Sequence, residues 1–176
     1  ALVVGNVTPN KNIETVVAAF ARLAASGTAC RLVVAGSDPS GALARAIDAA
    51  QPRPDVTMLT HVDDASLAAL YAGATCLIQA SHYEGFGLPV IEAMTAGCAV
   101  VASDIGVLRE VGGDAALYFP ATDADALADA VRQLATDAAM RGRHTEAGRV
   151  RAAQFRWGDA ANRTADLFDA VIANRP

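Results

Sequence analysis

Two glutamates flank a pair of glycines near the middle of the chain, in the segment 81–92 (SHYEGFGLPVIE). Glu84 immediately precedes Gly85-Phe86-Gly87, and Glu92 lies eight residues after Glu84. An apolar run before the glycines predicts a buried strand, and a longer one after them predicts a helix. Glycines at this spacing let the backbone turn tightly, and a turn that leads into a helix N-terminus presents consecutive N–H groups to a phosphate. The segment therefore predicts a phosphate-binding loop framed by two carboxylates.

Both glutamates also have purely structural interpretations. Ser81 and Glu84 have the spacing of a helix capping box, although the glycines that follow at once argue against a helix from Ser81. Glu92 could simply complement the dipole at the start of a helix. The apolar residues around Glu92, however, predict a helix that is buried on most sides, and a buried carboxylate needs partners. Ligand hydroxyl groups at a crevice would supply them.

Lysine occurs once in the chain, at Lys11, whereas arginine occurs 13 times. This imbalance favours a positional role for the one lysine. Lys11 lies in the loop after the first expected strand, where a cation would stabilise the charge that grows on a departing diphosphate. The alternative is a solvated residue at a helix start, where a cation is mildly unfavourable.

Short apolar strands alternate with helical patterns along the chain, which predicts an α/β fold. The expected strands cover residues 1–4, 31–35, 56–60, 76–79, 99–102 and 116–119. The expected helices cover residues 12–26, 43–50, 63–71, 88–96 and 124–135, with helical patterns continuing to the end. This order predicts a Rossmann-like parallel sheet of about six strands with helices on both faces. With strand order 3-2-1-4-5-6, the first and fourth strands flank the ligand crevice, and Lys11 faces Gly85–Gly87 across it.

Composition narrows the classes of protein. The 176 residues are 53% hydrophobic and 19% charged, which suits one globular domain. The net charge of -5 gives no reason to expect nucleic-acid binding. No apolar run approaches a membrane span, and no signal peptide precedes the first strand, so we expect a cytoplasmic protein. Cys30, Cys76 and Cys98 lack metal-site spacing and are expected to be reduced core residues.

The segment E-G-F-G-L-P-x-x-E-A-M-x-A-G at 84–97 resembles the donor-binding half of retaining GT-B glycosyltransferases. It is most similar to the group-1 (GT4) family, which uses nucleotide sugars. The resemblance continues at residues 4–12, 100–104 and 110–119. It implies that residues 1–176 form one donor-binding domain, the second domain of a GT-B fold. The acceptor-side domain, which comes first in such enzymes, would then be absent, and this chain alone would be inactive.

The resemblance also implies a role for each site residue in transfer of a hexosyl unit with retention of configuration. Glu84 and Lys11 would be catalytic, with Glu84 on the hydroxyls of the donor sugar and Lys11 on the diphosphate. Glu92 would bind the ribose, and the backbone of Val62 would contact the base. The donor, a UDP- or GDP-linked sugar, would be held without a cofactor or metal ion. The expected nucleotide-sugar site comprises Gly5, Asn6, Lys11, Val62, Glu84, Gly85, Phe86, Gly87, Leu88 and Glu92.

The chain departs from the family pattern at three positions. Asn6 and Asn10 stand where relatives often carry an arginine, so the diphosphate clamp is expected to be one charge short. His61 stands where a glycine is common and is expected to narrow the base pocket. Two other functions stay open: a stand-alone nucleotide-binding module, or another GT-B enzyme such as a phosphorylase or an epimerase. Membrane association would arise only through the missing half.

Residues outside this site receive structural interpretations. Trp157 is expected to anchor the final helix by packing. The arginines between 141 and 156 are expected to form the solvated face of an amphipathic helix. His82 and Tyr83 are expected to line the mouth of the crevice without chemistry.

Overall fold

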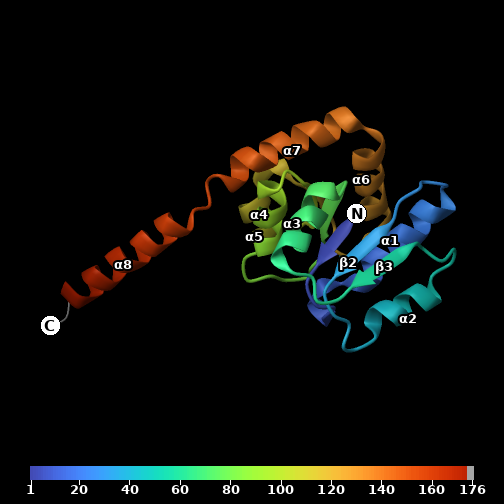
Figure 1. Ribbon diagram of the computed structural model, residues 1–176, viewed down its shortest axis with the longest axis horizontal. Coiled ribbons are helices and arrows are strands. Elements are labelled where there is room, and N and C mark those ends of the chain that lie inside the picture. The colour runs from blue at the N-terminus through green and yellow to red at the C-terminus, as the bar shows by residue number, and fades with distance from the viewer. Residues whose placement is uncertain (174–176) are drawn as a thin grey trace.

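The computed structural model describes residues 1–173, and a six-stranded parallel sheet forms their centre. The strand order is β3-β2-β1-β4-β5-β6, which confirms the predicted order. Figure 1 shows the paired strands β2 and β3 side by side. The order reverses between β1 and β4, whose residues Leu2 and Leu77 pair directly. The strands are β1 (Leu2–Val4), β2 (Leu32–Ala35), β3 (Val56–Leu59), β4 (Cys76–Gln79), β5 (Ala99–Ser103) and β6 (Leu117–Phe119).

Helices connect the strands and continue after the last one. The α-helices are α1 (Ile13–Ala25), α2 (Ala42–Ala49), α3 (Asp64–Gly73), α4 (Leu88–Thr95), α5 (Gly106–Gly112), α6 (Ala124–Thr136), α7 (Ala138–Ala152) and α8 (Trp157–Ala173). Single 3-10 turns cover Pro9–Lys11 and Gly113–Ala115. The expected elements are confirmed to within two residues, except that α5, which is short and has a glycine at each end, was not predicted.

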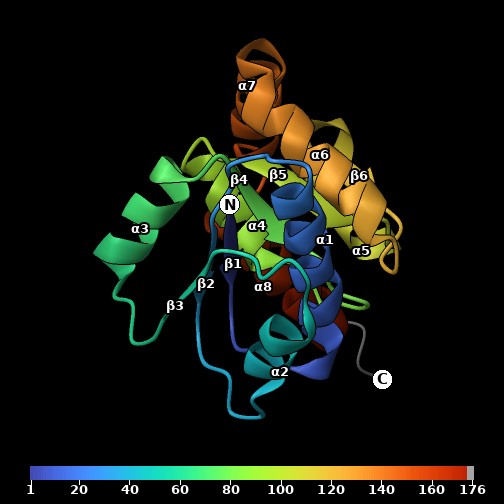
Figure 2. The same ribbon diagram turned by 90° about the vertical axis from the view of Figure 1, so that its right-hand side faces the viewer.

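The sheet carries a hydrophobic core on each face because successive strand residues point to opposite sides. Val3, Ile78 and Val101 pack with α1, α2 and α6. Their neighbours Leu2 and Val100 pack with α3, α4, α5 and the end of α7. Figure 2 shows α1 and α6 on one side of the sheet and α3 on the other. The carboxyl ends of all six strands are therefore held at one edge, where the site forms.

The last helix, α8, extends away from the rest of the domain (Figure 1), and none of its residues is buried. Trp157, at its start, is 80% exposed. The expectation that Trp157 anchors this helix by packing is therefore wrong. The helix itself was predicted correctly. The spacing of apolar residues predicts that a helix has an apolar face, but it does not predict which part of the protein packs against that face. None of the helices within residues 1–173 is both long and apolar enough to cross a membrane.

Candidate functional site

The loops after β1 and β4 meet at the carboxyl edge of the sheet, where the strand order reverses. The backbone N–H of His82 donates a hydrogen bond to the carbonyl of Asn10 at 2.8 Å. The Asn10 amide also donates to the Tyr83 carbonyl at 3.5 Å. Asn10 thus joins the two loops by neutral hydrogen bonds.

Lys11 and Glu84, which are 73 residues apart in sequence, form the central pair of the site. The Lys11 ammonium lies 2.7 Å from Oε1 of Glu84. Only 21% of the Lys11 side chain and 13% of the Glu84 side chain are exposed. Lys11 is therefore not a solvated residue at a helix start. Lys11 was expected to face Gly85–Gly87 across the crevice. Its ammonium group instead pairs with the carboxylate of Glu84, the residue immediately before the glycine loop.

The Glu84 carboxylate receives two further hydrogen bonds on the same oxygen. Nε2 of Gln79 donates to Oε1 at 2.5 Å, and Oγ of Ser81 donates at 2.6 Å. Ser103, on β5, holds this segment by donating from Oγ to the Ser81 carbonyl at 2.5 Å. Ser81 and Glu84 thus interact side chain to side chain with no helix between them, so the capping-box alternative is wrong.

This arrangement keeps Glu84 ionised. Burial alone would raise the pKa of the carboxyl group, but the hydrogen bonds from Lys11, Ser81 and Gln79, with the charge of Lys11, hold the pKa below its usual value. Gln79 was missed at the sequence level. The available signal was a buried polar residue at the end of the otherwise apolar strand Cys76–Gln79.

The glycine loop leads directly into the N-terminus of α4, as predicted. Gly87 has φ of 99° and immediately precedes α4, and a Cβ there would lie 2.9 Å from a methyl group of Leu108. Within residues 1–173, no acceptor is hydrogen-bonded to the backbone N–H groups of Gly85, Phe86 or Gly87. Free N–H groups at a helix N-terminus form a ready anion site.

Gly5 directly follows β1 and lies at the same carboxyl edge of the sheet. Its φ is 117°, and a Cβ there would lie 3.6 Å from Cε of Lys11. A side chain at this position would therefore be strained and would press on the lysine. Asn6, beside it, is exposed and accepts hydrogen bonds from the Ser37 backbone and hydroxyl at 3.1 and 2.8 Å, so its amide oxygen is used to join β1 to β2.

Glu92 lies on α4 and is exposed. The expectation of a carboxylate in a helix buried on most sides is wrong, because α4 buries only Val90, Ala93 and Met94. Leu88, at the helix start, is 46% exposed. The hydroxyl group of Tyr71 donates to Oε2 of Glu92 at 2.8 Å. Burial, followed by this hydrogen bond and the nearby negative charge, raises the pKa of Tyr71, so its hydroxyl stays a donor that orients Glu92.

The end of β3 forms a separate hollow of about 470 Å³, whose lining includes His61 and Val62. Val62 is half-buried, and His61 is exposed with φ of 56°, a left-handed conformation that glycine adopts without strain. This backbone geometry explains why a glycine would suit position 61. The hollow could receive a flat ring at the same sheet edge, and the His61 side chain contributes to its wall.

Other polar and thiol groups lie outside this constellation. Asp104 forms an ion pair with Arg109. The three cysteines are free thiols; Cys76 and Cys98 are buried, and Cys30 is half-buried. Burial raises the pKa of Cys76 to about 12 and that of Cys98 to about 11, so both remain neutral. Within residues 1–173, no group of three or more His, Cys, Asp or Glu side chains is placed to hold a metal ion.

The sequence of residues 1–151 matches the family described as glycosyl transferases group 1. This chain belongs to that family. Over 172 residues it is 33% identical to the O-antigen chain mannosyltransferase B of Escherichia coli, a match that covers 96% of this chain and 45% of that protein. The chain thus spans about half the length of the curated relatives it matches.

Two solved structures show the same fold. Sucrose-phosphate synthase from Thermosynechococcus elongatus aligns with a TM-score of 0.81 at 33% identity, covering 98% of this chain and 46% of that one. TarM from S. aureus, in complex with fondaparinux, alpha-GlcNAc-glycerol and UDP, aligns with a TM-score of 0.84 at 18% identity, covering 95% of this chain and 35% of that one. The fold is therefore the Rossmann-like domain of GT-B glycosyltransferases.

Proposed function

We propose that this domain binds a nucleotide-diphosphate sugar and belongs to a GT4-type glycosyltransferase that transfers a hexosyl unit with retention of configuration. The observation that carries the proposal is the Lys11–Glu84 pair, at 2.7 Å, beside the free N–H groups of Gly85–Gly87. This combination offers a cation and oriented dipoles to a diphosphate. Membership of the group 1 family supports the transfer reaction.

The site residues would divide the work by position. Transfer breaks the bond between the anomeric carbon of the sugar and the diphosphate oxygen, so negative charge grows on the departing nucleoside diphosphate. Lys11 and the N–H groups of Gly85–Gly87 would stabilise that charge. Glu84 would accept hydrogen bonds from the sugar, Glu92 would accept them from the ribose, and the Val62 backbone would contact the base in its hollow. Each group acts without a metal ion.

The acceptor would be bound by the part of the protein that this chain does not contain. The curated relatives are about twice as long as this chain, which supports a two-domain parent. The free thiols suit a reducing compartment, so we propose the cytoplasm as the site of action. A UDP- or GDP-linked hexose is the proposed donor.

Calorimetric titration of the 176-residue chain with UDP, GDP, ADP and their sugar conjugates tests the donor site. We expect one nucleoside diphosphate to bind, its sugar conjugate to bind more tightly, and the corresponding nucleoside to bind far more weakly. Absence of binding by all three diphosphates would overturn the proposal. NMR of the product made by the two-domain parent tests retention, because the one-bond C1–H1 coupling distinguishes the two anomeric configurations and can be compared with that of the donor.

A further inference from the structure

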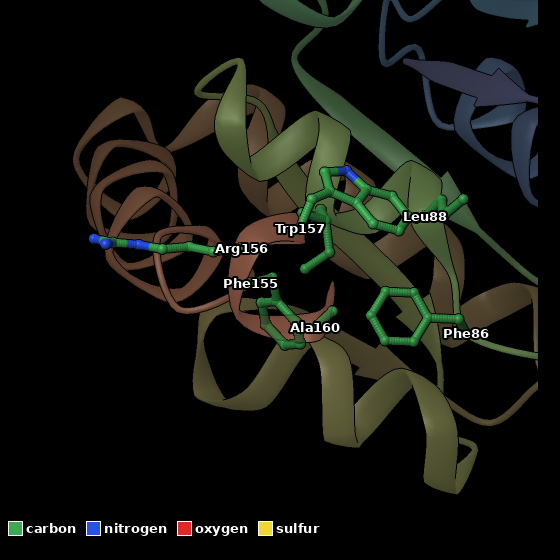
Figure 3. Close-up of a pocket in the computed structure, with 7 residues that line it drawn as sticks. Phe86, Leu88, Phe155, Arg156, Trp157 and Ala160 are labelled. Carbon is green, nitrogen blue, oxygen red and sulfur yellow. The ribbon is translucent and has the colours of Figure 1, made fainter. Parts of the chain in front are cut away.

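A small aromatic cluster lies behind the glycine loop, at the junction between α7 and α8. The rings of Phe86 and Phe155 meet edge to face, with centroids 5.8 Å apart and an interplanar angle of 77°. Together with Trp157 they line a hollow of about 330 Å³ (Figure 3). Phe86 belongs to the glycine loop, whereas Phe155 follows α7, so residues nearly 70 positions apart meet here.

Phe155 is in turn contacted by Arg151. The guanidinium carbon of Arg151 lies 5.0 Å from the Phe155 ring centroid, a cation–π distance. Arg151 donates from Nε to the Val111 carbonyl at 3.0 Å and from Nη2 to the Glu110 carbonyl. Both carbonyls belong to α5. Arg151 is therefore half-buried and connects α7 to α5, which corrects the expectation that it is only part of a solvated face.

The glycine loop needs such support. Gly85 and Gly87 remove the side chains that would otherwise restrict the backbone, and the N–H groups of residues 85–87 make no hydrogen bond within residues 1–173. Phe86 is 43% exposed, so burial in the core does not fix it. The Gly87 carbonyl accepts from the Val90 N–H at 2.9 Å, and the ring contact between Phe86 and Phe155 adds a side-chain attachment beside the free N–H groups.

We propose that Phe155 is a positioning residue for the donor site, which braces Phe86 and so holds the N–H groups of Gly85–Gly87 in their phosphate-binding arrangement. The proposal rests on the proposed donor site for its effect on ligand affinity. The bracing of Phe86 by Phe155 does not depend on the proposed donor site, because the two rings are in contact without a ligand. Aromatic pairs contribute modest energy, so the expected effect of losing the ring is about two- to twelvefold in affinity.

The test uses the ¹⁵N-labelled 176-residue chain and its variants Phe155→Ala, Phe155→Leu and Phe155→Tyr. Phe168→Ala is the matched control, since Phe168 is 62% exposed on α8. Without ligand, the NMR order parameters of the amides of residues 85–87 are expected to fall in Phe155→Ala and Phe155→Leu. They are expected to stay unchanged in Phe155→Tyr and in the control. Unchanged order parameters in both Phe155→Ala and Phe155→Leu would overturn the brace.

Titration with UDP and with GDP then measures the effect on the site. Phe155→Ala is expected to lower the affinity for the nucleotide that binds by about two- to twelvefold. In a Phe86→Ala background, Phe155→Ala is expected to cause no further loss of affinity. Unchanged affinity in Phe155→Ala, or additive losses in the double variant, would overturn the positioning role while leaving the donor site intact. If the wild-type chain bound neither nucleotide, the proposed function would fail, and the order parameters would still decide the brace.

Discussion

At the scale of single residues, Glu84 is notable for the way its two oxygens differ. Oε1 receives hydrogen bonds from Lys11, Gln79 and Ser81. Within residues 1–173, no donor is hydrogen-bonded to Oε2. The carboxylate is thus fixed by one oxygen and free at the other, which is the arrangement that a hydroxyl-binding residue in a preorganised site requires.

We expect Lys11→Ala to weaken binding of the nucleoside diphosphate by about 1–3 kcal/mol, or roughly five- to 150-fold, because it removes a charged hydrogen-bond donor. Calorimetric titration measures the change. Arg31→Ala is the matched control, since Arg31 pairs with Asp55 through side chains that are more than half exposed. Equal affinities for wild type and Lys11→Ala would mean that Lys11 serves only Glu84.

The same substitution changes the response to acid. Because the pKa of Glu84 is lowered in the folded protein, its ionised form contributes stability that is present above pH 4.5, the usual pKa, and is lost as the pH falls through the lowered value. Lys11→Ala removes one cause of the lowering. The fall in unfolding free energy below pH 4.5 should therefore be smaller in Lys11→Ala than in wild type, as measured by urea denaturation across the range.

Substitutions of Glu84 and of Glu92 should differ in the ligands whose binding they affect. Glu92 is the proposed ribose ligand and both ligands carry the ribose, so Glu92→Gln is expected to weaken binding of free diphosphate and nucleotide sugar equally, by about 1–3 kcal/mol. Glu84→Gln should spare the free diphosphate, since Lys11 loses a competing partner, and should reduce the extra affinity that the sugar provides. Titration of both variants with both ligands at one salt concentration decides this. If Glu84→Gln weakens binding of the free diphosphate as much as Glu92→Gln does, the role of Glu84 is instead to maintain the conformation of the glycine loop.

At the scale of elements, the loop after β1 is tied to its neighbours by Asn12. Its side chain is buried, its φ is 55°, and its amide donates to the carbonyls of Ala80 at 3.0 Å and Ala121 at 2.6 Å. Thr15 donates to its oxygen at 2.7 Å. One amide thus joins the β1, β4 and β6 connections, and it does so one residue after Lys11.

Asn12→Ala is expected to lower the unfolding free energy by about 2–4 kcal/mol, because buried carbonyls lose their donor and alanine must adopt a left-handed conformation. Asn12→Gly loses the same hydrogen bonds without that conformational cost, so it should be about 1 kcal/mol less destabilising. Urea denaturation of both variants provides the comparison. Identical losses would show that the backbone conformation contributes nothing to the cost.

The elements were predictable from sequence because their signals are local. Alternating apolar periods define where strands and helices lie, and Asp63 and Asp123 cap the starts of α3 and α6 by accepting hydrogen bonds from backbone N–H groups. The contacts between elements were not predictable in this way. The Gln79–Glu84 hydrogen bond, the exposure of Glu92 and the position of Phe155 behind Phe86 all depend on how distant segments pack. Periodicity carries no information on that packing.

At the scale of the whole molecule, the domain ends in a helix that adds nothing to its core. Apolar side chains recur along α8 at helical spacing, yet all of them are exposed. They are Trp157, Leu167, Phe168, Val171 and Ile172. By contrast, α7 packs against α4 and β5 and buries Ala152. The structural boundary of the domain therefore falls between α7 and α8.

This boundary predicts the outcome of truncation. A chain that ends at Arg156 should keep the unfolding free energy of the full chain to within about 0.5 kcal/mol, the range of surface changes, because α8 buries no side chain. It should also self-associate less, since it loses an exposed apolar stripe. A chain that ends at Asp137 is the control, and it should be strongly destabilised by the loss of α7 contacts. Urea denaturation followed by circular dichroism measures stability, and sedimentation velocity measures association. A loss of more than about 2 kcal/mol on removing α8 alone would show that this helix folds back on the domain in solution.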